Sequence, residues 1–452
     1  MVAYWIRAGT LIAGQTALGV RLLGPLSAAL GTVLLGDAAA RLIPPTMLPL
    51  SLRAWAAKRT KVGGRGPLHT RVSPVALTTG LLMNATLLFN AGAVIMTPDT
   101  PLLFFWTCCL WALARVASGG GEGPWWLAAG CFAGLAMVGK YSASLLLLGI
   151  ALWVLLTPTV RKRLRRPEPW IGGALGLLVF APVVVWNGNH GWISFMRQGA
   201  RAATWEPGRA ARFIGELLAG QAALATPLIF TLCVAGIVKS GRQAWTGRDP
   251  KPALLLALTL PTVVVVTQHA FGDRVQGNWP AIAYPAAIVA AASLSDTPWQ
   301  RLFGPAIALG AALSALIYLH AISRLVPLPA RLDPVALRLE GWDGVAAQIE
   351  SAAKQMHARF VAAPQYGVAS ELAWTVSRDF GVAGVDPRWP LLTLPIASLA
   401  GDRVILVAQS EARDGSMIGS ATRLSRDGTR IETFRLYLVD GSTLTASELP
   451  RP

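Results

Sequence analysis

The stretch that decides the fold begins with Met96-Thr97-Pro98-Asp99-Thr100-Pro101 and ends with Val138-Gly139-Lys140-Tyr141-Ser142. Between these ends lie two long apolar segments that are almost free of charge. Roughly 20 apolar residues cross the hydrocarbon core of a bilayer, so two such segments would cross it and return. The sequence therefore predicts that Asp99 and Lys140 emerge on the same side of a membrane, with a carboxylate and an ammonium together at its surface.

The composition of the whole chain is that of a membrane protein. Of its 452 residues, 53% are hydrophobic and only 14% are charged, and the mean hydropathy is +0.49. These values are too apolar for a soluble protein of this size. The net charge of +17 comes mainly from alternate loops, so we expect no nucleic-acid partner.

Apolar runs near the length of a membrane span recur along residues 1–326. Residues 1–21 are short and amphipathic with an aromatic start, which predicts a helix lying on the membrane surface. About ten spans follow, and the fold class expected is a multi-pass α-helical membrane protein. The predicted spans are residues 22–43, 74–95, 99–118, 125–139, 141–158, 170–187, 216–238, 252–270, 279–296 and 303–324.

Basic loops predict the orientation of these spans. Residues 44–73, 159–169 and the loop near residue 240 are rich in Lys and Arg, and helix counting places all three on one side. By the positive-inside rule that side is the cytoplasm. The opposite, extracytoplasmic face then receives Asp99, Lys140, residues 188–215, residues 276–280 and everything after Arg324.

Residues 327–452 are more polar and predict a second domain. A helical pattern covers residues 344–357, and strand patterns cover residues 360–363, 403–408 and 434–439. We expect a small extracytoplasmic, periplasmic α/β domain that either recognises an acceptor or caps the membrane domain. Neither this domain nor the four cysteines have the spacing of metal ligands, and Cys108, Cys109, Cys131 and Cys233 are interpreted as small core residues.

Asp99 and Lys140 each have a structural and a functional interpretation. Asp99 lies where a helix N-cap is expected, but a carboxylate there could equally act as a general base, or bind a metal or a substrate hydroxyl. Lys140 could be a lysine that extends its ammonium to the membrane interface. Its functional alternative is a point charge for a phosphate.

The segment Trp186-Asn187-Gly188-Asn189-His190-Gly191-Trp192 continues to Arg197 and Arg201 and is dense in Trp, Asn and Arg. Positive charge on the outer face requires a local anionic partner, which is either a substrate phosphate or lipid headgroups. His190 alone is more typical of a hydrogen-bonded structural residue than of a catalyst.

Residues 276–280 and the following Tyr284-Pro285 begin a predicted span on the same face. An interfacial aromatic belt explains Trp279 and Tyr284 without a functional role. Asn278 is different, because an amide at this level could bind a sugar hydroxyl.

In this order the motifs resemble one family. They are Gly19-Val20-Arg21-Leu22, Thr97-Pro98-Asp99-Thr100-Pro101-Leu102, Gly134-Leu135-Ala136 with Gly139-Lys140-Tyr141, Trp186-Asn187 with Trp192 and Ser194-Phe195, Gln198 with Arg201, and Asn278-Trp279-Pro280 with Tyr284-Pro285. The sequence resembles the polyprenyl-phosphate-sugar-dependent glycosyltransferases of family 39, the protein mannosyltransferase type, which share the GT-C fold and include the lipid A aminoarabinose transferases. The resemblance covers almost all of residues 1–326.

This resemblance implies inverting transfer of a sugar from a polyprenyl (undecaprenyl) phosphate donor to a lipid, glycan or protein acceptor. The reaction would take place at the outer face of a bacterial cytoplasmic membrane. It implies a catalytic role for Asp99 and contacts of Lys140, Arg201 and Arg197 with the donor phosphate. Asn187, His190, Gln198, Asn278, Trp279 and Tyr284 are the substrate-binding candidates. No metal ligand is assigned, and the use of a divalent metal cofactor is left open.

The sequence departs from the family in one respect. Members have an earlier span and a first outer loop with an Asp-Glu pair that supplies the principal catalytic carboxylate, and residues 1–452 contain no such loop. Either the start is set too late, which we favour, or the form is truncated or degenerate. The expectation is that the chain as given lacks normal turnover.

Two other classes of function compete with a glycosyltransferase. A transporter or flippase of a lipid-linked substrate would place ionisable residues near the middle of interrupted spans. Here Asp37, Arg115 and Glu216 lie near predicted span ends. A noncatalytic membrane scaffold gains support only from the missing first loop.

Overall fold

A computed structural model describes residues 1–43, 73–119, 122–201, 207–326, 328–329, 332–386, 388–389, 399–411 and 415–449. The chain divides into two compact units, Met1–Tyr318 and Leu319–Pro452. The predicted boundary at residue 327 lies close to this division. The first predicted basic loop, residues 44–73, lies outside the described residues except for Ser73.

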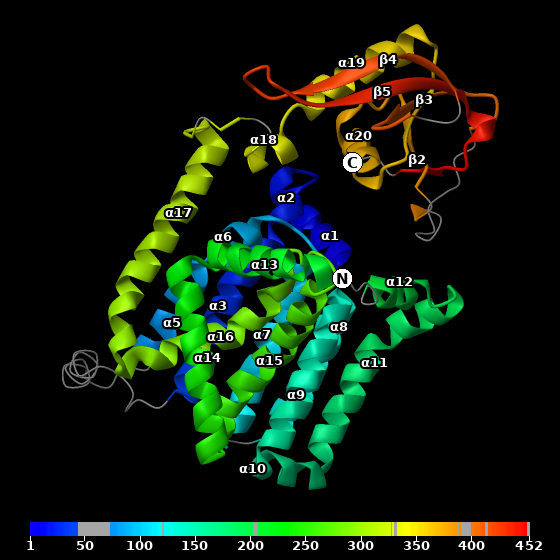
Figure 1. The fold of residues 1–452 in the computed structure, drawn as a ribbon. Helices are drawn as coiled ribbons and strands as arrows, with labels where there is room; N and C mark the ends of the chain where they lie inside the picture. The colour runs from blue at the N-terminus through cyan, green and yellow to red at the C-terminus, as the bar shows by residue number, and fades with distance from the viewer. Residues whose placement is uncertain are drawn as a thin grey trace. The chain divides into compact units, whose positions relative to one another are not determined.

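Helices make up the first unit (Figure 1). Their bounds are α1 Val2–Ala13, α2 Ala17–Arg21, α3 Leu23–Leu42, α5 Pro74–Asn84, α6 Leu87–Val94, α7 Asp99–Ser118, α8 Glu122–Gly139, α9 Ser144–Leu156, α10 Pro158–Arg161, α11 Pro167–Asn189, α12 Ile193–Arg201, α13 Ala210–Ala225, α14 Pro227–Gly247, α15 Pro250–Ala270, α16 Tyr284–Ala292 and α17 Phe303–Ser323.

The helices support a multi-pass membrane protein. Among the described residues, five helices are long and apolar enough to cross a membrane, and up to eight if each bent pair of helices is one span. The remaining two predicted spans correspond to α8 and to the short helices between residues 279 and 296. A count of ten therefore stays a prediction.

Two predicted spans are wrong as single straight helices. Residues 74–95 are divided between α5 and α6, which are bent by 66°. Residues 216–238 are divided between α13 and α14, which are bent by 106° at residue 226 (Figure 1). Thr226 has φ 67° and ends α13, and Pro227 begins α14. Proline disfavours a helical conformation in the residue before it. The bend leaves α13 lying across the ends of neighbouring helices.

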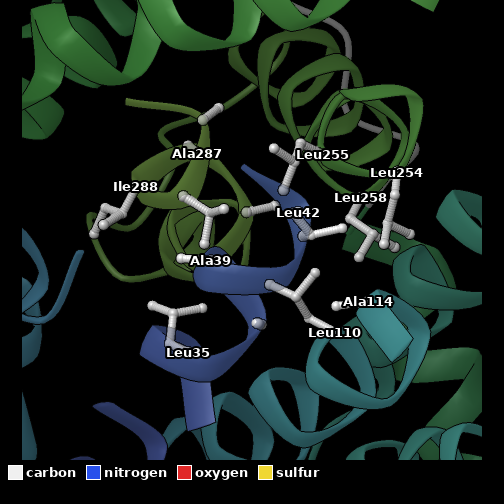
Figure 2. Close-up of a cluster of buried hydrophobic side chains, with 14 of the residues drawn as sticks. Leu35, Ala39, Leu42, Leu110, Ala114, Leu254, Leu255, Leu258, Ala287 and Ile288 are labelled. Carbon is white, nitrogen blue, oxygen red and sulfur yellow. The ribbon is translucent and has the colours of Figure 1, made fainter. Parts of the chain in front are cut away.

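The core of the first unit is built from small and branched apolar residues on four helices. Figure 2 shows Leu35, Ala39 and Leu42 of α3 meeting side chains of α7, α15 and α16. Leu35, Leu110 and Leu254 are fully buried. Apolar side chains packed at this density fix the relative positions of the helices that carry the site described below.

Helices α8 and α11 approach each other closely through glycines. A Cβ added to Gly130 would lie 1.8 Å from the carbonyl oxygen of Gly172, and one added to Gly134 would lie 2.5 Å from that of Gly176. Both helices thus carry glycines four residues apart at one interface. This is the pattern by which membrane helices pack backbone against backbone.

The second unit is an α/β domain, as the strand and helix patterns predict. Its six-stranded sheet has the order β4-β5-β3-β1-β2-β6, in which β1 is parallel to β2 and β3. The predicted strands at residues 360–363 and 403–408 coincide with β1 and β3. The elements are α18 Pro334–Leu339, α19 Trp342–Gln355, β1 Phe360–Ala363, α20 Tyr366–Thr375, β2 Gly381–Gly384, β3 Arg403–Ala408, β4 Ser416–Leu424, β5 Arg430–Asp440 and β6 Ser447–Glu448.

A buried polar cluster begins the second unit. Asp333 caps α18 by accepting hydrogen bonds from the backbone N–H groups of Val335 and Ala336, at 2.8 and 3.2 Å. Its other oxygen contacts Arg324 and lies 3.2 Å from His320 Nε2. Burial raises the pKa of Asp333, but the two backbone hydrogen bonds, His320 and the charge of Arg324 together hold it below its usual value.

This cluster predicts acid sensitivity of the second unit. Because the folded-state pKa of Asp333 is depressed, its contribution to stability is present above the unfolded value, about 3.9. That contribution is lost as the pH falls through the lower folded-state value. Asp333→Asn should remove this part of the pH dependence, measured by hydrogen–deuterium exchange of the β1 amides in the full chain. The exposed Asp343→Asn is the matched control, and equal effects of both variants would contradict the assignment.

Candidate functional site

Asp99 is the first residue of α7, and the structure rules out the predicted capping role for its side chain. The backbone N–H of Asp99 is bound by Thr97 Oγ1 at 3.3 Å, and Thr100 Oγ1 accepts from the N–H of Thr97 at 3.2 Å. The Asp99 carboxylate makes no cap hydrogen bond. Neighbouring threonines therefore fix the start of the helix and leave the carboxylate for other partners.

Two side chains from distant parts of the sequence bind this carboxylate. Lys140 Nζ donates to Asp99 Oδ1 at 2.7 Å, and Asn278 Nδ2 donates to Asp99 Oδ2 at 2.6 Å. The predicted proximity of Asp99 and Lys140 is thus confirmed. We call Asp99, Lys140 and Asn278 the polar triad.

The polar triad is partly shielded from solvent. The side chain of Asp99 is 13% exposed and that of Lys140 is 30% exposed. Partial burial lowers the local dielectric, so the ion pair is stronger than one on an open surface. Lys140 therefore does not behave as a free interfacial lysine.

Two members of the polar triad line an apolar pocket of about 270 Å³. Asp99 and Asn278 line it together with Thr97 and Thr100. The rest of its wall comes mainly from small and apolar residues of α3, α6 and α7, including Gly24, Gly31, Leu88, Gly92, Leu103 and Phe104. Such a pocket suits an apolar chain that carries a polar group at one end.

Residues around Asn187 connect the end of α11 to the residue after Lys140. Asn187 is fully buried, and its amide donates to the Tyr141 hydroxyl at 3.2 Å. The side-chain oxygen Oδ1 of Asn187 accepts a hydrogen bond from the backbone N–H of Ser194 at 3.3 Å. The Tyr141 ring lies 4.9 Å from the ring of Phe195 on α12. The described contacts of Asn187 are therefore with protein groups, and they hold α12 near the polar triad.

The other candidates of this segment differ in exposure. His190 Nδ1 lies 2.7 Å from the Trp186 carbonyl oxygen, and its ring stacks on Trp186 at 4.1 Å, as a structural histidine would. Arg197 and Gln198 are exposed on α12. The side chain of Arg201 lies outside the described part of the structure. Roles of Arg197, Gln198 and Arg201 stay predictions.

The last two candidates flank Asn278 in the sequence. Trp279 packs against His269, with the ring centroids 5.0 Å apart. Tyr284 is 5% exposed, and its hydroxyl donates to Gln221 Oε1 at 3.1 Å. The structure thus gives Tyr284 a partner inside the protein instead of the predicted position at a membrane interface.

Gln221 of α13 is the residue that sequence reasoning missed. It is 5% exposed and also donates from Nε2 to the Gly277 carbonyl oxygen at 2.9 Å. The signal was an amide inside an apolar segment, and polar groups at such positions are costly unless they have a partner.

The described residues contain no group of three or more His, Cys, Asp or Glu side chains that could hold a metal ion. The four cysteines are free, and three of them are buried. The polar groups of the site described above are the carboxylate, ammonium and amide of the polar triad.

Comparisons with known proteins agree with the resemblance predicted from the sequence. Residues 70–186, which include Asp99 and Lys140, match the family model described as dolichyl-phosphate-mannose-protein mannosyltransferase. The lipid A galacturonosyltransferase RgtD of Rhizobium johnstonii is 27% identical over 304 residues, covering 67% of this chain. The chain spans 57% of the length of that relative.

Two solved structures also resemble the chain. ArnT from Cupriavidus metallidurans, bound to undecaprenyl phosphate, has 17% identity and a TM-score of 0.49, with 79% of this chain and 61% of that chain covered. The archaeal oligosaccharyltransferase AglB from Archaeoglobus fulgidus has 12% identity and a TM-score of 0.38, with 79% and 46% covered. From the family model and the curated relative, the resemblance predicted from the sequence is confirmed: this is a membrane protein similar to glycosyltransferases of the dolichyl-phosphate-mannose-protein mannosyltransferase family.

Proposed function

We propose that this chain takes part in inverting transfer of a sugar from a polyprenyl phosphate donor to a lipid, glycan or protein acceptor at the outer face of the cytoplasmic membrane. The observation that carries the proposal is an apolar pocket lined by Asp99 and Asn278, with the Lys140 ammonium bound to the same Asp99 carboxylate. A lipid-linked sugar phosphate needs an apolar surface for its chain and a cation for its phosphate. The site offers both together.

Lys140 is the proposed contact of the donor phosphate. When the bond between sugar C1 and the phosphate oxygen breaks, its electron pair leaves with the phosphate, and a fixed cation stabilises the charge that develops. The contact with Asp99 holds the ammonium in place before a phosphate arrives. Arg197 and Arg201 are proposed as further cations for the phosphate, because Phe195 of α12 packs on Tyr141, the neighbour of Lys140.

Asp99 is the proposed acceptor of a proton from the attacking hydroxyl. In inverting transfer the acceptor oxygen attacks C1 opposite the phosphate, and its proton passes to a base within hydrogen-bond reach. Asp99 lines the pocket, whereas Asn278 and Lys140 restrict the rotation of its carboxylate. Because the relative RgtD is named for lipid A, a lipid acceptor is the first to test.

The second unit, Leu319–Pro452, is proposed to lie on the same outer face. It follows the last predicted span, and the basic loops predict the cytoplasmic side for the opposite helix ends. In that position it either recognises the acceptor or caps the membrane domain.

A photoreactive polyprenyl phosphate tests the proposed donor site. The protein in lipid nanodiscs should crosslink at peptides that contain Asp99 or Lys140, and polyprenyl phosphate should compete about one hundredfold better than uncharged polyprenol, since a charge-assisted hydrogen bond to phosphate is lost. Equal competition by the two lipids would contradict a phosphate site.

A second assay separates the classes of function. Proteoliposomes receive a donor labelled in its sugar together with lipid A. Label recovered on lipid A supports transfer, whereas label that crosses the bilayer still attached to the donor supports a flippase. Crosslinking without either outcome would reduce the role of this chain to donor binding.

A further inference from the structure

Gln221 links two segments that meet beside the polar triad. It projects from α13, accepts from the Tyr284 hydroxyl on α16, and donates to the Gly277 carbonyl oxygen. Both partners and Gln221 itself are buried or half-buried. Both the oxygen and the nitrogen of the Gln221 amide therefore have a hydrogen-bond partner. Because the amide is rigid, a change in one of these hydrogen bonds alters the geometry of the other.

The turn that contains Gly277 carries Asn278 to Asp99. Trp279 N–H donates to the Gln276 carbonyl oxygen at 3.0 Å, and Ala281 N–H donates to that of Asn278 at 3.1 Å, so the turn is short and closed. Asn278 then reaches Asp99 across 179 positions in the sequence. The position of the Gly277 carbonyl therefore determines where the Asn278 amide can lie.

Helix α13 also supports this turn by packing. A Cβ on Gly277 would lie 2.9 Å from Leu224 Cδ1, so α13 and the turn are in close contact. Phe213 and Leu217 of α13 form a buried cluster with Val266, Ala270 and Val275, against which Trp279 packs. The bend that turns α13 away from α14 is what brings Gln221 and these apolar side chains to the turn.

We infer that Gln221 is a positioning residue for Asp99, acting through Gly277 and the Asn278 amide, and that Tyr284 orients Gln221. Loss of the Gln221 donor releases the turn, the Asn278 amide leaves Asp99 Oδ2, and the carboxylate gains freedom to turn away from Lys140. The effect of this loss on sugar transfer rests on the proposed function. The effect on the contact between Asp99 and Lys140 is independent of the proposed function.

Gln221→Met tests this inference, because methionine keeps the length of the side chain and removes both hydrogen-bonding groups. The rate at which a water-soluble, amine-reactive acylating reagent modifies Lys140 is measured by peptide mass spectrometry. This rate should rise about fivefold, the factor for loss of one hydrogen bond. Lys354 in the second unit is the internal reference and should not change. Polyprenyl phosphate crosslinking is measured in parallel.

Tyr284→Phe removes only a hydroxyl and serves as the milder variant if Gln221→Met folds poorly. Its matched control is Tyr318→Phe, because the Tyr318 hydroxyl also donates to one acceptor, the Asn90 carbonyl oxygen at 3.0 Å. We expect faster acylation of Lys140 in Tyr284→Phe and a wild-type rate in Tyr318→Phe.

A double mutant separates positioning from general stability. If Gln221 acts through Asn278, then Gln221→Met should add nothing to the acylation rate already reached in Asn278→Ala. Lower thermal stability of Gln221→Met and Tyr284→Phe with a wild-type Lys140 rate would overturn the inference. So would full additivity in the double mutant. A wild-type protein that takes up no polyprenyl phosphate would defeat the proposed function alone, because the acylation rates do not require a donor.

Discussion

Lys140→Ala should lower the affinity for a polyprenyl phosphate by about one hundredfold, the effect of losing a charge-assisted hydrogen bond of roughly 3 kcal/mol. Asp99→Asn should act in the opposite direction on binding. The ammonium of Lys140 is shared with Asp99 at 2.7 Å, so a bound phosphate has to compete with the carboxylate and is repelled by it. Removing that negative charge should raise the affinity by about three- to tenfold.

Native mass spectrometry of the protein in nanodiscs with added polyprenyl phosphate measures both affinities. Lys162→Ala is the matched control, because Lys162 is an exposed lysine in the predicted cytoplasmic loop after α10. An unchanged affinity in Lys140→Ala would remove Lys140 from the donor site. A loss of affinity in Asp99→Asn as large as in Lys140→Ala would show that the carboxylate binds the donor itself instead of competing with its phosphate.

Gly172→Leu should destabilise the protein by about 3 kcal/mol, the upper end of the usual cost of overpacking. A Cβ at position 172 would lie 2.4 Å from the Trp126 carbonyl oxygen, so a side chain there separates α11 from α8. The neighbouring Gly173 has no atom within 4 Å of an added Cβ. Gly173→Leu makes the same chemical change on the same helix and should stay within about 0.5 kcal/mol of the wild type.

Thermal unfolding followed with a thiol-reactive dye measures this difference, because Cys108, Cys109 and Cys233 are buried in the folded protein and become accessible to the dye when it unfolds. Equal stability losses for both leucine variants would mean that the close approach of α8 and α11 does not control stability. Since α11 carries Asn187, the Gly172→Leu variant should also loosen the contact with Tyr141.

Local patterns were sufficient to predict the helical membrane domain and much of the second unit. The strands β1 and β3 and the helix α7 begin and end where the sequence predicts them. Their signals are local: alternation or apolar content bounded by turn residues. The meeting of Asp99 with Lys140 also followed from local reasoning, because two spans of ordinary length return the chain to the side where it started.

Other parts of the site depend on contacts that no local pattern contains. The bond between Asn278 and Asp99 joins residues 179 positions apart, and the hydrogen bond between the buried Tyr284 and Gln221 joins residues 63 positions apart. An aromatic residue beside a proline occurs both at membrane interfaces and in protein cores, so this pattern does not distinguish the two locations. The capping interpretation of Asp99 failed because Thr97 and Thr100 supply the oxygens that close the turn.

The break between α13 and α14 bears on how the chain is counted through the bilayer. At 1.5 Å per residue, the 21 residues of α14 extend for about 32 Å, which by itself matches a hydrocarbon core of roughly 30 Å. The 16 residues of α13 run at nearly a right angle to it, with a bend of 106° between the two helices. A single crossing made by α14 would keep the parity of one unbroken span, and with it the predicted face of each later loop.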